Sequence, residues 1–250
     1  DGLVSFLEAY GNQIKKIYFT HSTKSDKLLS ALSVRYCQLP ICIQALQIGC
    51  PKLQTLMNVT PVPTMTRNTP SSKSGFPMLE ELCIATSSHS FMTDNDLNNV
   101  LHGSPHLRVL DLRGGSRITA TGHSHWPLPC ERLECLYWGL YFNINTMVAS
   151  KKGIHMLAHK WSSTLREIDL ASQPFSEEDM GIAMGHLAHG GGVNLFCSLN
   201  PSGINITSSA LRKCMYFLNF QHSSCWYLPR GLKRVYHGQE DIQLLLDKLD

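Results

Sequence analysis

Charged residues are scarce in this sequence, and features that mark several classes of protein are missing. Only 16% of the 250 residues are Asp, Glu, Lys or Arg, against roughly 25% in an average soluble domain. The net charge of +3 is too small to indicate a nucleic-acid or membrane-binding surface. No apolar run is long enough for a membrane-spanning helix. Hydrophobic residues still make up 43% of the chain, which allows a packed core and excludes wholesale disorder.

Signatures of common enzymes and of closed metal sites are also missing. The sequence has no G-x-S-x-G, no H-E-x-x-H, no P-loop and no glycine-rich dinucleotide loop. His123 and His125 with Cys130 and Cys135 form the best metal candidate, but their spacing matches no closed zinc site. We therefore expect a protein that is not an enzyme and that needs no cofactor and no metal.

The nine cysteines form no C-x-x-C pair, and most lie inside apolar stretches such as 82–84. An odd, scattered set of this kind predicts reduced thiols in a cytoplasmic or nuclear protein rather than a disulfide framework. The chain begins Asp-Gly-Leu without a signal-like segment, so we expect a fragment of a longer protein.

One short pattern recurs along the whole chain, with apolar residues at positions 1, 4 and 6 of each unit. Its first positions are Ile14, Leu29, Leu53, Leu79, Leu107, Leu133, Leu165, Phe196 and Met215. Most spacings lie within or near the period of leucine-rich repeats, which is roughly 20–29 residues. Two sixth positions depart from the pattern, because Asn58 and Pro201 are not the large apolar residues expected there. Nine units in phase predict a solenoid, because no single unit can bury its apolar face alone.

The predicted fold class is α/β: a leucine-rich-repeat solenoid (horseshoe) with an inner parallel β-sheet and outer helices or irregular returns. Each unit should supply a short strand whose positions 4 and 6 point into the core, while positions 3, 5 and 7 point outward. We expect a single domain over residues 1–250, with about nine irregular repeats.

The segments between strands are predicted individually. Residues 40–48 and 94–101 should be helical, and the capping-box spacing of 176–179 should begin a third helix. Residues 60–75 are expected to form a long loop. Two further returns, at 147–160 and 190–192, are expected to be irregular.

Several of these units resemble the repeats of a known family. Gly49–Leu53, Leu107–Gly114 and Leu32–Cys37 are similar to the cysteine-containing repeats of F-box/LRR-repeat proteins. Leu165–Leu170 and the tail Tyr227–Arg234 resemble the carboxy-terminal repeat region of that family. The resemblance implies a non-catalytic substrate-recognition domain of a cullin-RING ubiquitin ligase, acting in protein ubiquitination and ubiquitin-dependent degradation.

The resemblance also implies how such a ligase is assembled. In that family an amino-terminal F-box docks the S-phase-kinase-associated adaptor, and through it the cullin, while the repeats hold the protein substrate. No F-box-like Leu-Pro-x-Glu segment is present in this sequence. The adaptor and the cullin are therefore expected to bind upstream of residue 1. The residues themselves leave a second class open, a repeat scaffold or inhibitor unrelated to ubiquitin ligases.

The register of the repeats predicts a protein-binding row on the concave face. Position 5 of successive units contributes Asp111, Tyr137, Asp169, Asn200 and Asn219, position 7 adds Arg113 and Gln221, and position 3 adds Glu167. A tyrosine among carboxylates and amides suits a polar rim around an aromatic anchor. The alternative is that these are merely solvated strand residues.

The expected partner is a protein substrate, with no nucleic acid and no membrane involved, and we expect a monomer. The basic cluster Arg230, Lys233 and Arg234 is either a solvated terminal cap or a second docking patch.

Overall fold

In the part of the chain that the structure describes, nine short strands form one sheet, and their order in the sheet is their order in the chain. The computed structural model describes residues 2–18, 43–57, 75–85, 93–115, 117–119, 130–139, 153–170, 173, 175–190, 194–197, 219–222 and 235–249. Within these residues the strands are β1 (Lys16–Tyr18), β2 (Thr55–Met57), β3 (Glu81–Cys83), β4 (Val109–Asp111), β5 (Cys135–Tyr137), β6 (Glu167–Asp169), β7 (Asn194–Cys197), β8 (Asn219–His222) and β9 (Val235–His237). Strands β1 to β8 are parallel, and β9 pairs antiparallel with β8.

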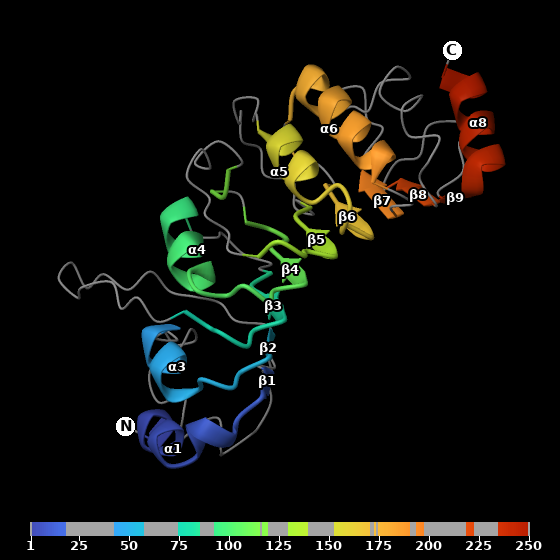
Figure 1. Ribbon diagram of the computed structural model, residues 1–250. Helices are drawn as coiled ribbons and strands as arrows, with labels where there is room; N and C mark the ends of the chain where they lie inside the picture. The colour runs from blue at the N-terminus through green and yellow to red at the C-terminus, as the bar shows by residue number, and fades with distance from the viewer. Residues whose placement is uncertain are drawn as a thin grey trace.

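The helices lie on the side of the sheet away from the inner edge of the arc that the strands form (Figure 1). They are α1 (Gly2–Tyr10), the 3-10 turn η1 (Gly11–Gln13), α3 (Ile43–Gly49), α4 (Asp94–Leu101), α5 (Ile154–Lys160), α6 (Glu177–His189) and α8 (Gly238–Leu249). The two ends of the chain lie at opposite ends of the arc. Among the described helices, none combines the length and the apolar character that crossing a membrane requires.

The apolar pattern of the sequence forms the core. The middle residue of each central strand is at most 1% exposed, and these residues are Leu56, Leu82, Leu110, Leu136 and Ile168. The first position of the same units is at most 2% exposed, in Leu53, Leu79, Leu107, Leu133 and Leu165. Burying one such side chain contributes about 1.5–3 kcal/mol. Two stacked rows of leucine and isoleucine therefore hold neighbouring units together.

Backbone hydrogen bonds fix the register where each strand begins. The carbonyl oxygen of Glu80 accepts from the N–H groups of Arg108 (2.8 Å) and Val109 (3.0 Å). The carbonyl of Arg108 accepts in the same way from Glu134 (2.8 Å) and Cys135 (3.0 Å). Because one residue of each unit holds two residues of the next, a slip of one position would break both bonds.

The predicted helix starts at 94 and 176 are confirmed. Thr93 caps α4 in a capping box with Asp96, whose carboxylate accepts from the Thr93 N–H at 2.9 Å. The Ser176 hydroxyl accepts from the N–H of Asp179 (3.2 Å) at the start of α6. The return at 147–160 was expected to be irregular, but residues 154–160 form α5. The expected loop at 60–75 lies outside the described residues, apart from Gly75.

The backbones of neighbouring units approach each other closely in the segments that precede the strands. Gly75 packs against the backbone of His102 and Gly103, where a Cβ atom would collide with the carbonyl oxygen of His102. Gly103 has φ of 69°, a conformation that suits glycine at the end of α4.

The predicted repeats near the two ends have different outcomes. Strand β1 pairs directly with β2, and the expected unit at 29–34 lies outside the described residues. Near the other end the strands pair in a different register from the predicted one. Leu195 and Phe220 align with Ile168 in the central row, instead of Leu199 and Leu218. Strand β9 was not predicted.

Candidate protein-binding face

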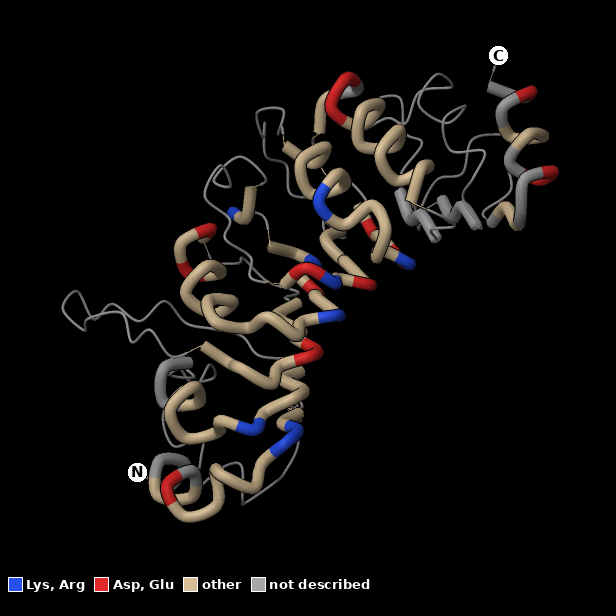
Figure 2. Tube along the Cα trace, viewed as in Figure 1, with Lys and Arg blue, Asp and Glu red and all other residues tan. Residues whose placement is uncertain are grey.

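The first and last residues of β2 to β6 form a sheet face on the opposite side from the core. Side chains alternate along a strand, so residues on either side of a buried middle leucine point away from the core. No described helix lies on this side, which is the inner side of the arc (Figure 1). Acidic and basic residues gather along this edge of the central strands (Figure 2). We call this surface the concave face.

Three of the predicted residues are neighbours in the sheet. Asp111 pairs with Tyr137, and Tyr137 pairs with Asp169, on adjacent parallel strands. The prediction that these position-5 residues form a row is therefore confirmed for β4 to β6.

Asp111 is only 5% exposed, and its carboxylate is bound by groups of neighbouring residues. Arg113 donates from Nε to Oδ1 (2.9 Å) and from Nη2 to Oδ2 (2.5 Å), and its backbone N–H also reaches Oδ1 (3.1 Å). The Cys83 thiol donates to Oδ2 at 3.4 Å. These four contacts hold the Asp111 carboxylate in one position.

Arg113 links this carboxylate to the tyrosine of the next strand. Its guanidinium carbon lies 5.3 Å from the centre of the Tyr137 ring, a cation–π distance. The Arg113 side chain remains 43% exposed. Asp111, Arg113 and Tyr137 therefore form one connected group that presents a guanidinium and an aromatic ring to the solvent.

Tyr137 is half-buried, and its hydroxyl hydrogen-bonds with Glu167 on β6. Burial, together with this carboxylate, raises the pKa of Tyr137 far above its ordinary value. Burial also raises the pKa of the neighbouring Cys135 thiol. Both groups are neutral at physiological pH, so the phenol serves as a hydrogen-bond donor.

The expectation that the whole row is exposed was wrong for two residues. Asp111 and Asp169 are 5% and 2% exposed, so their carboxylates lie beneath the surface. Arg113, Tyr137 and Glu167 are half-buried and can be reached from outside. Among the predicted residues whose side chains the structure describes, the accessible ones are therefore these three.

The predicted row also changes beyond β6. Asn200 lies outside the described residues. Phe196 takes the place beside Asp169, and Gln221 pairs with Phe196, so Gln221 occupies position 5 rather than 7. Asn219 aligns with Asn194 and Glu167, which is position 3 rather than 5. A shift by two residues keeps both on the same face of the sheet.

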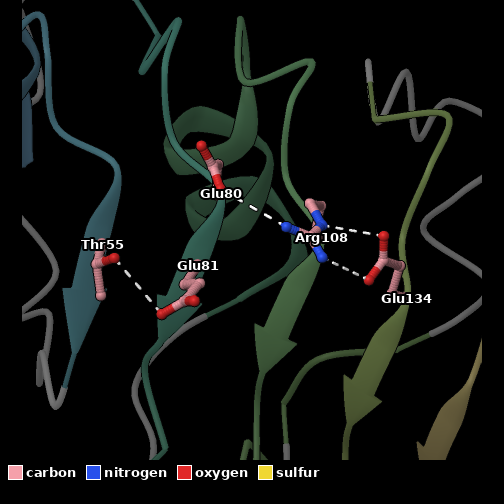
Figure 3. A network of polar contacts seen from close by, with 5 residues as sticks. All are labelled: Thr55, Glu80, Glu81, Arg108 and Glu134. Carbon is pink, nitrogen blue, oxygen red and sulfur yellow. Dashed lines mark hydrogen bonds and ion pairs between the residues drawn. The ribbon is translucent and has the colours of Figure 1, made fainter.

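Position 2 of the repeats carries a charge ladder that the sequence analysis missed (Figure 3). Arg108 makes a two-pronged contact with Glu134, from Nε to Oε1 (3.0 Å) and from Nη2 to Oε2 (2.8 Å). Its Nη1 lies 3.8 Å from Glu80 Oε2 on the other side. The hydrogen bond with Arg108 lowers the pKa of Glu134. Alternation of Glu and Arg at this position, continued by Arg166, was the available signal.

The described residues contain no group of histidine, cysteine and carboxylate side chains that could hold a metal ion. His123 and His125 lie outside the described residues. Cys50, Cys83, Cys130 and Cys135 are thiols, and none of these four is in a disulfide bond. Burial raises the pKa of the Cys130 thiol to about 11, which makes it unreactive at physiological pH.

Comparison of the chain with protein-family models, with curated proteins and with solved structures gives no match.

Proposed function

We propose that this chain is a leucine-rich-repeat solenoid that binds a protein partner on its concave face and has no catalytic activity of its own. The observation that carries this proposal is the uncovered row of Arg113, Tyr137 and Glu167 on a sheet whose strands follow chain order. One strand per apolar unit, with a returning segment between strands, is the construction of a repeat solenoid. A half-buried tyrosine beside an arginine matches the residue types that dominate binding energy in protein interfaces.

We further propose that this solenoid is the substrate-recognition part of an F-box-type cullin-RING ubiquitin ligase. The support is the resemblance of residues 49–53, 107–114 and 165–170 to the repeats of F-box/LRR-repeat proteins. In this assignment the adaptor and the cullin bind an F-box outside this chain, and the captured protein is ubiquitinated and degraded. A repeat scaffold or inhibitor would use the same face without meeting an adaptor.

The experiment compares two variants of the full-length protein in cells. Tyr137→Ala with Glu167→Gln changes the accessible row, whereas Glu178→Gln changes an exposed residue of α6. Partners retained by Glu178→Gln and lost from the double variant are those that bind the concave face. We expect such partners to co-purify with the adaptor and cullin, and their ubiquitination to fall in the double variant. Partners without adaptor or cullin would favour the scaffold, and equal capture by both variants would contradict binding at this face.

A further inference from the structure

Two accessible carboxylates of the concave face, Glu81 and Glu167, form no ion pair with a described lysine or arginine. Glu80 and Glu134 share Arg108, and Asp111 pairs with Arg113. Glu81 accepts a hydrogen bond from the Thr55 hydroxyl (3.4 Å), and Glu167 is hydrogen-bonded with Tyr137. Among the described residues, no lysine or arginine side chain forms an ion pair with Glu81 or Glu167. Both side chains are half-buried rather than fully solvated.

These two carboxylates lie at the ends of one row of the sheet. Glu81 pairs with Val109, Val109 with Cys135, and Cys135 with Glu167, on four successive parallel strands. Val109 and Cys135 are half-buried, and the Cys135 thiol is neutral. The surface therefore presents carboxylate, apolar, apolar and carboxylate in sequence, with the Tyr137 ring beside the apolar centre. We call these four residues the acidic–apolar row.

The local charge is opposite in sign to that of the whole chain. Positions 2, 3, 5 and 7 of the units of β3 to β6 carry six carboxylates, in Glu80, Glu81, Asp111, Glu134, Glu167 and Asp169, and three guanidinium groups, in Arg108, Arg113 and Arg166. Six negative and three positive charges leave −3, whereas the chain as a whole carries +3. A face with this excess attracts a positively charged segment and repels an acidic one.

Arginine side chains of the chain itself already bind carboxylates beside these strands. Arg108 lies between two carboxylates of neighbouring units, and Arg113 lies between a carboxylate and the Tyr137 ring. Glu81 and Glu167 offer the same chemistry without a described internal cation. Complementarity of charge therefore favours a partner that supplies lysine or arginine at these two points.

The spacing of the row defines the partner further. Neighbouring strands lie about 4.8 Å apart, so three strand spacings separate Glu81 from Glu167 by about 14 Å. An extended peptide advances about 3.3 Å per residue, so four steps cover about 13 Å. Residues one, three and five of such a peptide face the same side.

We propose that the acidic–apolar row binds an extended segment of the partner protein with lysine or arginine at its first and fifth residues and an apolar residue at its third. The two cations meet Glu81 and Glu167, and the apolar side chain lies on Val109 and Cys135 beside Tyr137. This inference rests on the proposed function, because it names the kind of segment that the concave face takes.

The test uses the purified chain and synthetic peptides with the core Lys-Ser-Leu-Ser-Arg. Fluorescence anisotropy should show that this peptide binds more tightly than the matched Glu-Ser-Leu-Ser-Glu peptide. It should also bind more tightly than a control peptide whose two cationic residues are only two positions apart. Raising the salt concentration should weaken the binding. The inference is overturned if the unaltered chain does not prefer the basic peptide, or if the spacing of the two cations in the peptide has no effect. This arm of the test needs no variant of the chain.

Variants of the chain give the second arm of the test. Glu81→Gln with Glu167→Gln should weaken the basic peptide roughly three- to tenfold, the effect of losing two exposed ion pairs. Glu81→Lys with Glu167→Lys should reverse the preference toward the acidic peptide. The matched control is Glu178→Gln with Glu240→Gln, which removes two exposed charges from α6 and α8 and should change nothing. Circular-dichroism melting establishes that each variant is folded.

The outcomes separate this inference from the proposed function. If the glutamine double variant still captures cellular partners that the Tyr137→Ala with Glu167→Gln variant loses, the concave face binds protein but the basic segment is wrong. If neither double variant loses any partner, the proposed function itself fails.

Discussion

At the scale of single residues, the contrast between Asp111 and Glu134 shows how burial decides the value of an ion pair. Both carboxylates receive two donors from one arginine. Asp111 is 5% exposed, and a thiol and a backbone N–H also bind it. The side chains of Arg108 and Glu134 are 52% and 32% exposed, so water screens their attraction. The pair with the buried carboxylate should therefore contribute more to stability than the exposed pair.

This contrast gives a prediction for Asp111→Asn. The asparagine amide has one acceptor oxygen where the carboxylate has two, so some of the donors around Asp111 lose their partner. Arg113 also loses the ion pair that holds it over Tyr137. We expect the free energy of unfolding, measured by urea denaturation, to fall by about 1–3 kcal/mol. The control is Arg108→Gln, which removes an exposed pair of similar geometry and should leave the denaturation midpoint unchanged. Equal loss in both variants would show that burial does not distinguish these pairs.

At the scale of elements, the sequence predicted the strands best where polar residues punctuate the apolar pattern. In β6 both neighbours of Ile168 are carboxylates, and in β4 Asp111 follows Leu110, so a slip of one position would bring a charge into the core. Around β7 the run 195–199 contains four apolar residues, and a shift by an even number keeps the same face inside. The register there was ambiguous for that reason.

Other errors have different physical causes. The three-residue strand β9 is too short to show a period, and its antiparallel direction depends on tertiary contacts. Helix α5 did carry a signal, because Ile154, Leu157, Ala158 and Trp161 have helical spacing and are buried. The site was partly predictable, since register alone placed Asp111, Tyr137 and Asp169 together. Their burial was not predictable, because it depends on how Arg113 folds back onto Asp111.

The packed pair α5 and α6 carries a cluster of titratable groups that predicts a pH response. The rings of His159 and His186 lie 4.7 Å apart, and His155 pairs with Asp179 of α6. Burial lowers the pKa of His186, and the neighbouring histidines 159, 155 and 189 lower it further. The folded state therefore binds a proton less readily at His186 than the unfolded state does.

A lowered histidine pKa has a definite sign for stability. The contribution of neutral His186 is present above the unfolded pKa, about 6.5, and is lost as the pH falls through the folded pKa. We expect His186→Gln to reduce the loss of thermal stability between about pH 7 and pH 5. His106→Gln, at an exposed turn residue, should leave that loss as it is in the unaltered protein. Identical pH profiles for the His186 variant and the unaltered protein would contradict the prediction.

At the scale of the whole molecule, each strand between β1 and β9 is bonded to its two neighbours in the chain and to no other described strand. The core follows the same arrangement, with leucines of one unit stacked on those of the next. Stability in such an array is close to a sum over neighbouring units. A central unit loses contacts on two sides when it is weakened, whereas an end unit has a single neighbour.

This arrangement predicts how damage at the centre spreads. Leu136 is 1% exposed in the middle of β5, and Leu136→Ala should cost about 2–5 kcal/mol. Hydrogen exchange followed by mass spectrometry should then show the largest loss of protection in β4, β5 and β6, with smaller changes at β1 and β9. Ile182→Ala, at a 44% exposed position on α6, provides the matched control and should leave exchange nearly unchanged. A uniform rise in exchange over all nine strands would mean that the molecule opens as a single cooperative unit. A rise confined to the centre would mean that the surface formed by Tyr137 and Glu167 can open while both ends of the sheet stay folded.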